Sequence, residues 1–328
     1  MGLPQLSIVI PVYNEEALLP ELLSRTATVT RRLETEFAVP PSGVEVIFVN
    51  DGSTDRTFDV LKTHCETHRG YVLVNLSRNH GHQLAITAGL DCARGDAVVL
   101  IDGDLQDPPE VILDLYRRYL DGYDVVYAVR NSRQGEGWFK LATASTFYRV
   151  LRRLTAVDIP ANTGDFRIMS RRVADVLRAL RERQRFIRGL VSWAGFRQTG
   201  ILYDRQPRAA GHTKYPLPKM IKFAIDGITA FSAVPLRLIS YFGLLTAAAG
   251  FCYAIYVLYL RLFTQHTLQG WTSLIVIVVL LGGIQLIALG VIGEYLSRVH
   301  DESKSRPLYI IENLYAADRQ REETTVTQ

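Results

Sequence analysis

Two long stretches without a charged residue, 238–260 and 272–293, constrain this chain more than any other feature. Each exceeds the roughly 20 apolar residues that a helix needs to cross the hydrocarbon core of a bilayer. A pair of buried core helices is the alternative, but core helices rarely run that long without a charge. The segment between the stretches is short, so residues 237–296 are predicted to form a transmembrane hairpin.

Basic residues lie mainly outside the hairpin, and only Arg261 lies in its connecting loop. They are Lys214, Lys219, Lys222 and Arg237 before the first stretch, and Arg298, Lys304 and Arg306 after the second. The positive-inside rule therefore places both termini in the cytoplasm of a multi-pass protein of the cell inner (plasma) membrane. No signal peptide is expected, because the apolar run 6–12 is short and lacks a basic start.

The remaining composition excludes several classes of protein. There are 37 Lys and Arg against 33 Asp and Glu, and this net charge of +4 is too small for a typical nucleic-acid binder. Nucleic acid is therefore not an expected partner. Cys65, Cys92 and Cys252 show no metal or redox spacing and fit a reducing compartment.

Residues 1–214 are predicted to form a cytosolic α/β domain. Short β-rich runs alternate with helical patterns, which is typical of a mainly parallel sheet covered by helices. The expected strands are 6–10, 44–49, 71–76, 97–101 and 125–129. The expected helices are 15–35, 54–68, 83–93 and 109–120. Ligands of such sheets collect beyond the carboxyl ends of the strands.

Polar residues follow three of these strands, at 11–16, 50–55 and 102–107. Some have a structural explanation: Asn14 and Ser53 as helix caps, Asp51 in a turn, and Asp107 as a cap before two prolines. For Ser53, Asp55 and Asp107, a structural and a ligand role both stay open.

Asp102 and Asp104 differ from the other strand-end residues. Two carboxylates one residue apart at a buried strand end repel each other unless a cation compensates their charge. A hard divalent ion that also touches a diphosphate would supply that compensation.

This ordered set of motifs resembles the family-2 inverting glycosyltransferases of the GT-A (Rossmann-like) fold. It is most similar to the polyprenyl-phosphate glycosyltransferases, the group of the bactoprenol glucosyltransferases and dolichol-phosphate mannose synthase. The resemblance extends from residue 6 to about residue 315. The segments that carry it are 11–15, 51–53, 75–79, 102–106, 128–133, 162–167 and 293–296.

The resemblance implies a site for a nucleotide sugar. The base and ribose would be held by Pro11, Tyr13, Asn14 and Glu15, and Asp51 would accept a hydrogen bond from the base. Asp102 would contact the ribose or the metal shell, while Asp104 and Gln106 would bind Mg²⁺ or Mn²⁺. That ion would neutralise charge on the departing diphosphate.

The resemblance also assigns basic residues to phosphate groups. Arg205 and Lys214 would close over the donor diphosphate, although a patch for lipid headgroups is the alternative, which we favour for Lys219 and Lys222. Arg130, Arg133 and Lys140 would bind the acceptor phosphate. Arg130 is the foremost candidate, because a planar guanidinium holds a phosphate bidentately.

The implied chemistry is the transfer of one hexose, with UDP-glucose as the preferred donor, to undecaprenyl phosphate. UDP-GlcNAc, GDP-mannose and UDP-aminoarabinose derivatives stay open as donors. A lipid monophosphate is already largely anionic at neutral pH, so a strong general base is optional. Asp165 would act as base or position sugar hydroxyls; a loop aspartate paired with Arg167 is the alternative. The catalytic candidates are thus Asp165, Asp104 and Arg130.

Two further segments complete the predicted organisation. Residues 215–236 mix apolar and basic positions at helical spacing, which indicates interfacial helices on a lipid surface or helices packed on the domain itself. Residues 297–328 would form a cytosolic tail, and packing of hairpins offers a route to homo-oligomers. The Gln-x-x-Arg-Trp segment of processive synthases is absent, which favours one transfer per acceptor. A processive synthase and a non-catalytic membrane scaffold are the competing functions.

Overall fold

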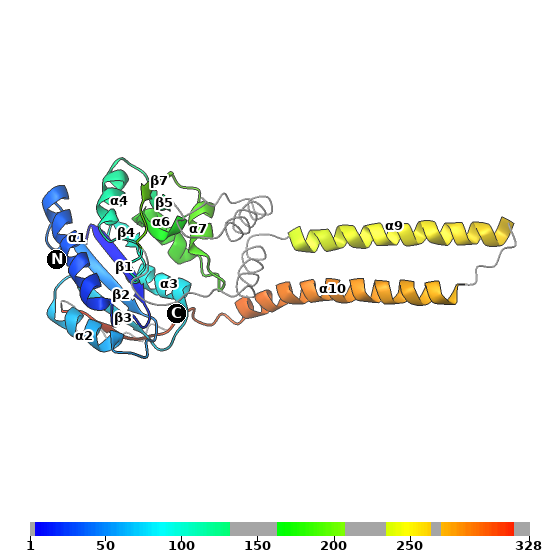
Figure 1. Ribbon diagram of the computed structural model, residues 1–328, viewed down its shortest axis with the longest axis horizontal. Coiled ribbons are helices and arrows are strands. Elements are labelled where there is room, and N and C mark those ends of the chain that lie inside the picture. The colour runs from blue at the N-terminus through cyan, green and yellow to red at the C-terminus, as the bar shows by residue number, and fades with distance from the viewer. Residues whose placement is uncertain (1–3, 132–162, 207–233, 264–269, 318–328) are drawn as a thin grey trace. The chain divides into compact units, whose positions relative to one another are not determined.

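The computed structural model describes residues 4–131, 163–206, 234–263 and 270–317. By its internal contacts the chain divides into a catalytic unit of residues 1–152, 156–217 and 307–328, and a second unit of 153–155 and 218–306. Figure 1 labels most of the described elements of the catalytic unit. The described elements of this unit are β1 Leu6–Val12, α1 Leu19–Phe37, β2 Val44–Asn50, α2 Thr57–Thr67, β3 Tyr71–Leu76, α3 His82–Cys92, β4 Ala97–Leu100, α4 Val111–Leu120, β5 Val125–Arg130, β6 Thr163–Ser170, α6 Arg171–Ala179, α7 Ile187–Trp193, β7 Gln198–Tyr203 and β8 Ile311–Tyr315.

Eight strands form one sheet in the order β7-β5-β6-β4-β1-β2-β3-β8. The centre, β4-β1-β2-β3, is parallel, and β5 also pairs in parallel with β7. The pairings β4–β6, β5–β6 and β3–β8 are antiparallel, so the sheet is mixed. The five predicted strands correspond to β1–β5, and the four predicted helices to α1–α4. Strands β6, β7 and β8 were not anticipated.

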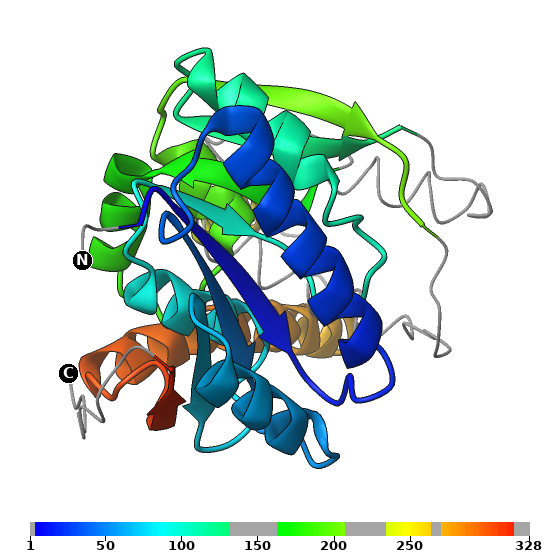
Figure 2. The same ribbon diagram turned by 90° about the vertical axis from the view of Figure 1, so that its left-hand side faces the viewer.

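Helices cover both faces of the sheet. Every residue of β1 and β2 is buried, which explains their apolar runs. On one face, Ile8 and Phe48 pack in a single core with residues of α1, α2 and α4, and Figure 2 shows α1 crossing this face. On the other face lies α3, where a Cβ on Gly89 would come 2.2 Å from Val9 Cγ1. Only glycine allows α3 to lie this close to β1.

The second unit contains α9, Val234–Phe263, and α10, Trp271–Ser303, which contact each other. Two windows in these helices, Leu236–Tyr253 and Ile277–Ser303, are long and apolar enough to cross a membrane, and no part of either window is buried. A core helix of a soluble domain would bury these residues. The hairpin prediction and these helices therefore agree in position and character.

Candidate active site

The polar loops after β1, β2 and β4 lie at one edge of the sheet. Val12 at the end of β1 is opposite Asn50 at the end of β2, and Asp51 N–H donates to the Val12 carbonyl at 3.0 Å. Beside β1 on its other side, Ile101 N–H donates to the Val9 carbonyl at 3.1 Å. Parallel pairing thus brings together three segments that are 40 to 90 residues apart in sequence.

Side-chain bonds join the first loop to the second. Asn14, with φ of 54°, donates its N–H to Ser53 Oγ at 3.0 Å and accepts the N–H of Thr54 on Oδ1 at 2.7 Å. Glu16 N–H donates to Asp55 Oδ2 at 3.2 Å. The N-cap positions of α1 and α2 are Leu18 and Arg56, so Asn14 and Ser53 are not helix caps. Their hydrogen bonds hold the two loops together. Tyr13, in the first of these loops, is 45% exposed.

Asp51 organises the loop after β3. Its buried carboxylate accepts N–H groups from His80 at 2.7 Å and from Gly81 at 2.9 Å. Burial raises the pKa of Asp51, and the two N–H bonds offset part of that effect. Gly52, at φ of +67°, lies so close to Arg78 that a Cβ would come 2.4 Å from its carbonyl carbon. The loops after β2 and β3 therefore form one compact wall.

The loop after β4 is tightly turned. Asp104 Oδ1 accepts the N–H of Gln106 at 3.1 Å, and buried Leu105 between them adopts a left-handed φ of 56°. A non-glycine residue in this region is strained, and such strain collects at functional sites. Asp102 precedes the turn and is partly exposed.

The carboxylate of Asp102 lies near several other carboxylates. Its pKa is raised to about 6: burial raises it most, His82 lowers it, and the neighbouring carboxylates of Asp165, Asp107 and Asp104 raise it. A cation bound beside these carboxylates would reverse this shift.

The donor set fits a sparse divalent-ion site. Among the residues that the structure describes, no three His, Cys, Asp or Glu side chains converge as a metal centre. Asp102, Asp104 and Gln106 supply oxygen ligands, which Mg²⁺ and Mn²⁺ prefer, and Mg²⁺ is commonly held by one or two carboxylates with substrate phosphates and water. The carboxylates that lie near Asp102 are consistent with such an ion.

Asp165 lies on strand β6 and is 1% exposed. His82 Nε2 and Gln83 Nε2 approach its Oδ2 at 3.2 and 3.1 Å, and Arg188 Nε donates to Oδ1 at 2.9 Å. Burial raises the pKa of Asp165, but Arg188, His82 and Arg167 outweigh it and hold this pKa well below its usual range. Asp165 is therefore an ionised carboxylate with bonds to both oxygens.

This environment corrects the alternative considered for Asp165, a loop aspartate paired with Arg167. Asp165 lies in a strand, and the guanidinium of Arg167 instead donates to two main-chain carbonyls, of Asp165 at 3.3 Å and Gly164 at 2.8 Å. Burial lowers the pKa of Arg167 to about 10. The cation that pairs with the Asp165 carboxylate is Arg188.

His82, Gln83 and Arg188 are site residues that the sequence interpretation missed. His82 Nε2 lies 3.2 Å from Asp165 and 3.4 Å from Asp102 Oδ1, so the imidazole joins both carboxylates. Burial lowers the pKa of His82, but the two aspartates outweigh it and raise this pKa above its usual value. The signal for His82 and Gln83 was available, because they follow β3 at the same sheet edge. Arg188 follows no parallel strand and gave no such signal.

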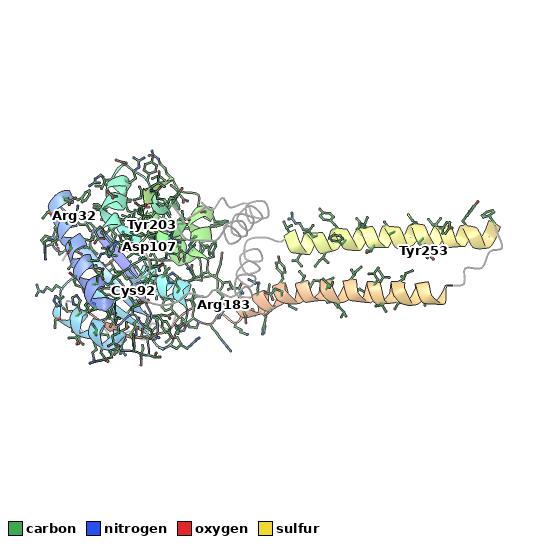
Figure 3. All side chains as sticks on the ribbon, viewed as in Figure 1. Arg32, Cys92, Asp107, Arg183, Tyr203 and Tyr253 are labelled. Carbon is green, nitrogen blue, oxygen red and sulfur yellow. The ribbon has the colours of Figure 1, made fainter. Side chains whose placement is uncertain are left out.

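Asp107 links two basic residues of the site. It is fully buried; Tyr203 Oη donates to its Oδ1 at 2.5 Å, and Arg205 Nε lies 3.3 Å from the same oxygen. Arg130 Nε donates to Tyr203 Oη at 3.4 Å. Figure 3 labels Asp107 and Tyr203 within the catalytic unit. The N-cap of α4 is Glu110, so Asp107 is not the helix cap. Its carboxylate contacts Arg205 directly and is linked to Arg130 through the hydroxyl of Tyr203.

Several predicted site residues lie outside the described residues. They are Arg133, Lys140 and Lys214, together with 215–233, the larger part of the segment predicted as interfacial helices. Pro11 and Glu15 are described. Pro11 lies within β1, and Glu15 N–H donates to Thr57 Oγ1 at 2.9 Å.

A mixed sheet of this topology, with acidic residues at the ends of its parallel strands, agrees with the GT-A fold of sugar-transferring enzymes. The chain belongs to glycosyl transferase family 2, whose model matches residues 7–178, and it is a glycosyltransferase. A second model, the GtrB C-terminal hairpin, matches residues 234–299. The family expectation from the sequence is thus confirmed.

Named relatives cover almost the whole chain. An uncharacterized glycosyltransferase, YkcC of Bacillus subtilis (strain 168), is 51% identical over 97% of this chain and 96% of its own length. The bactoprenol glucosyl transferase of Shigella phage SfV is 40% identical over 94% and 98%. Among solved structures, a mannosyltransferase from Pyrobaculum calidifontis in complex with GDP-Man and Mn²⁺ is 19% identical, with a TM-score of 0.43 over 90% and 88%.

Proposed function

We propose that this enzyme moves one hexose from a nucleotide sugar, UDP-glucose, onto undecaprenyl phosphate. The observation that carries the proposal is the juxtaposition at Asp107, where an acidic strand-end loop meets two arginines, Arg130 and Arg205. Both substrates carry phosphate groups, and guanidinium groups bind phosphate. The relatives named bactoprenol glucosyl transferases support the choice of a polyprenyl phosphate acceptor and of glucose.

The donor nucleotide would bind over the loops that follow β1, β2 and β3. The exposed ring of Tyr13 offers a stacking surface for a base, beside Pro11, Asn14 and Glu15. Asp51 would read the base with the lone pairs that its two backbone bonds leave free. Arg205 and Lys214 would contact the diphosphate.

A divalent ion, Mg²⁺ or Mn²⁺, would be held by Asp104 and Gln106, with Asp102 in or next to its shell. When bound, the ion neutralises charge on the departing diphosphate. The protein's own contribution is to hold the carboxylates of Asp102 and Asp104 together at one turn.

Arg130, with Arg133 and Lys140, would bind the acceptor phosphate. One of its oxygens attacks the anomeric carbon while the bond to the diphosphate breaks, so the configuration inverts and the nucleoside diphosphate leaves. Asp165 is ionised and already bonded on both oxygens, which suits a positioning role toward sugar hydroxyls better than a proton acceptor. Catalysis then rests on alignment and charge neutralisation.

We further propose a membrane arrangement for this reaction. Residues 1–214 form the cytosolic catalytic domain, 215–236 interfacial helices, 237–296 the two-span hairpin and 297–328 a cytosolic segment. Two candidate spans and the flanking basic residues support an enzyme at the cytoplasmic face of the membrane, where undecaprenyl phosphate is embedded.

The test is incubation of the purified full chain with undecaprenyl phosphate, Mg²⁺ or Mn²⁺ and a panel of UDP- and GDP-sugars, followed by mass analysis of the lipid. We expect one hexose per lipid from UDP-glucose. A product with several sugars would instead indicate a processive synthase. If no donor gives a glycolipid product, the proposal is overturned.

A further inference from the structure

The chain returns to the catalytic unit after the hairpin. Residues 307–328 are grouped with that unit, and β8 pairs antiparallel with β3, with Tyr315 opposite Leu73. Figure 2 shows β8 in red near the C-terminal end of the chain. Strand β8 is therefore the outermost strand on this side of the sheet, next to β3 and one strand away from β2.

A chain of hydrogen bonds leads from β8 to the loop after β2. Glu312 Oε2 accepts from Asn75 Nδ2 at 2.9 Å, and Asn75 Oδ1 accepts from Asn50 Nδ2 at 2.7 Å. Asn50 Oδ1 then accepts the N–H of Ser53 at 3.3 Å. The two asparagines are buried and directly opposite each other on β2 and β3.

This chain has a fixed direction because a carboxylate only accepts hydrogen bonds. Glu312 therefore selects the amide orientation in which Asn75 presents Nδ2 to it and Oδ1 to Asn50. That choice in turn aims Asn50 Oδ1 at the main chain of Ser53. In the flipped orientation, Asn75 Oδ1 would face the carboxylate oxygen of Glu312, which is unfavourable. Without the carboxylate, both orientations of Asn75 are allowed, and the acceptor for the Ser53 N–H is no longer fixed.

Two further contacts hold the same segment in place. Tyr309 Oη donates to Asp91 Oδ2 on α3 at 2.6 Å. The ring of Tyr315 lies 5.8 Å from that of Phe58 on α2, and Lys62 Nζ lies 5.0 Å from its centre. The segment thus touches α2 and α3, the helices that follow the loops after β2 and β3, so Glu312 is held at a defined position.

We propose that Glu312 is a positioning residue for the nucleotide-binding loop 51–55 and acts through Asn75 and Asn50. The inference rests on the proposed function, in which this loop binds the donor base. It makes the chain beyond the hairpin a part of the donor site.

The test compares Glu312→Ala, Glu312→Gln and the control Asn313→Ala in the full chain reconstituted with undecaprenyl phosphate. The net contribution of an ordinary hydrogen bond predicts a rise of about threefold to tenfold in KM for UDP-glucose in Glu312→Ala. The turnover number and the KM for the lipid phosphate stay near wild-type values. Glu312→Gln can accept or donate, so it no longer enforces one amide orientation of Asn75, and its KM lies between those of the wild type and Glu312→Ala. Asn313→Ala, next on the same exposed strand, leaves it unchanged.

A double variant separates positioning from general destabilisation. If Glu312 acts through Asn75, Asn75→Ala with Glu312→Ala raises the KM no further than Asn75→Ala alone. An unchanged KM in Glu312→Ala, or fully additive effects, overturns the inference while the wild-type activity stands. If the wild-type chain transfers no sugar, the proposed function fails; calorimetric binding of UDP to wild type and Glu312→Ala then decides the inference separately.

Discussion

The guanidinium of Arg188 contacts both carboxylate oxygens of Asp165, with Nε 2.9 Å from Oδ1 and Nη2 3.3 Å from Oδ2. The two residues lie on α7 and β6, and their pairing fixes an ionised carboxylate in an almost fully buried position. A buried carboxylate without such a partner is protonated instead. The pair therefore sets both the charge and the orientation of Asp165.

We expect Arg188→Lys to lower turnover by about 100-fold, because an ammonium cannot reproduce the two-pronged contact and small misplacements of reacting groups have effects of this size. Replacing the guanidinium by an ammonium, which cannot hold both oxygens, also weakens the main interaction that lowers the pKa of Asp165. That pKa rises, so activity of the variant declines on the acid side at a higher pH than in the wild type. The measurement is a pH profile of kcat for both proteins.

The matched control is Arg118→Lys. Arg118 is an exposed residue of α4 that pairs with Asp121, the residue that follows this helix. The activity and pH profile of this variant stay those of the wild type. An Arg188→Lys profile that matches the wild type would show that the pair does not set the charge of Asp165.

Asp104→Ala should reduce transfer by about 100- to 1,000-fold at saturating Mg²⁺, because charge on the leaving diphosphate is no longer neutralised. The effect should be larger on turnover than on the binding of the nucleoside alone, which Asp104 does not touch in the proposed arrangement. Rates with labelled UDP-glucose and calorimetric titration with uridine measure the two effects. Asp114→Ala, at an exposed position of α4, is the control.

The sequence predicted much of the donor side of this site because periodicity is local. Parallel strands such as β1 and β2 are buried throughout and mainly apolar, and the polar residues after them fall at one sheet edge by topology alone. Asp51, Asp102 and Asp104 are found in this way. What the rule gives is position; the bonds of Asn14 to Ser53 and Thr54 required the structure.

The rest depended on contacts between distant residues. Strand β6 alternates Asp165 and Arg167 with apolar residues, and buried charges in a strand do not follow any simple hydrophobic pattern. Arg188 meets Asp165 across 23 residues of sequence, and His82 meets it across 83. Strand β8 is only five residues long and is separated from β3 by the hairpin, so no local pattern could pair them.

Tyr203→Phe should destabilise the catalytic unit by about 1–3 kcal/mol, the range for leaving one buried polar partner unsatisfied. Tyr203 Oη is the closest donor to the fully buried Asp107, and it also accepts from Arg130. Thermal unfolding of the full chain in detergent measures the change. Tyr119→Phe removes a hydroxyl of a partly buried ring on α4 and should change the midpoint far less. Equal midpoints for the two variants would contradict a structural role of the Tyr203–Asp107 bond.

Acid should weaken the fold partly through Asp124. The bidentate hydrogen bonds from Arg172 lower the pKa of this carboxyl most strongly; burial raises it, and Ser170 Oγ adds a further bond that lowers it. Because the pKa is lower in the folded than in the unfolded chain, the ionised form stabilises the fold above the unfolded value of about 4. That stability is lost as the pH falls through the folded pKa. Asp124→Asn should therefore lower the unfolding temperature at pH 7 and reduce its further decline in acid. The exposed Asp121→Asn is the control, and parallel pH curves for wild type and Asp124→Asn would exclude Asp124 as a source of the acid sensitivity.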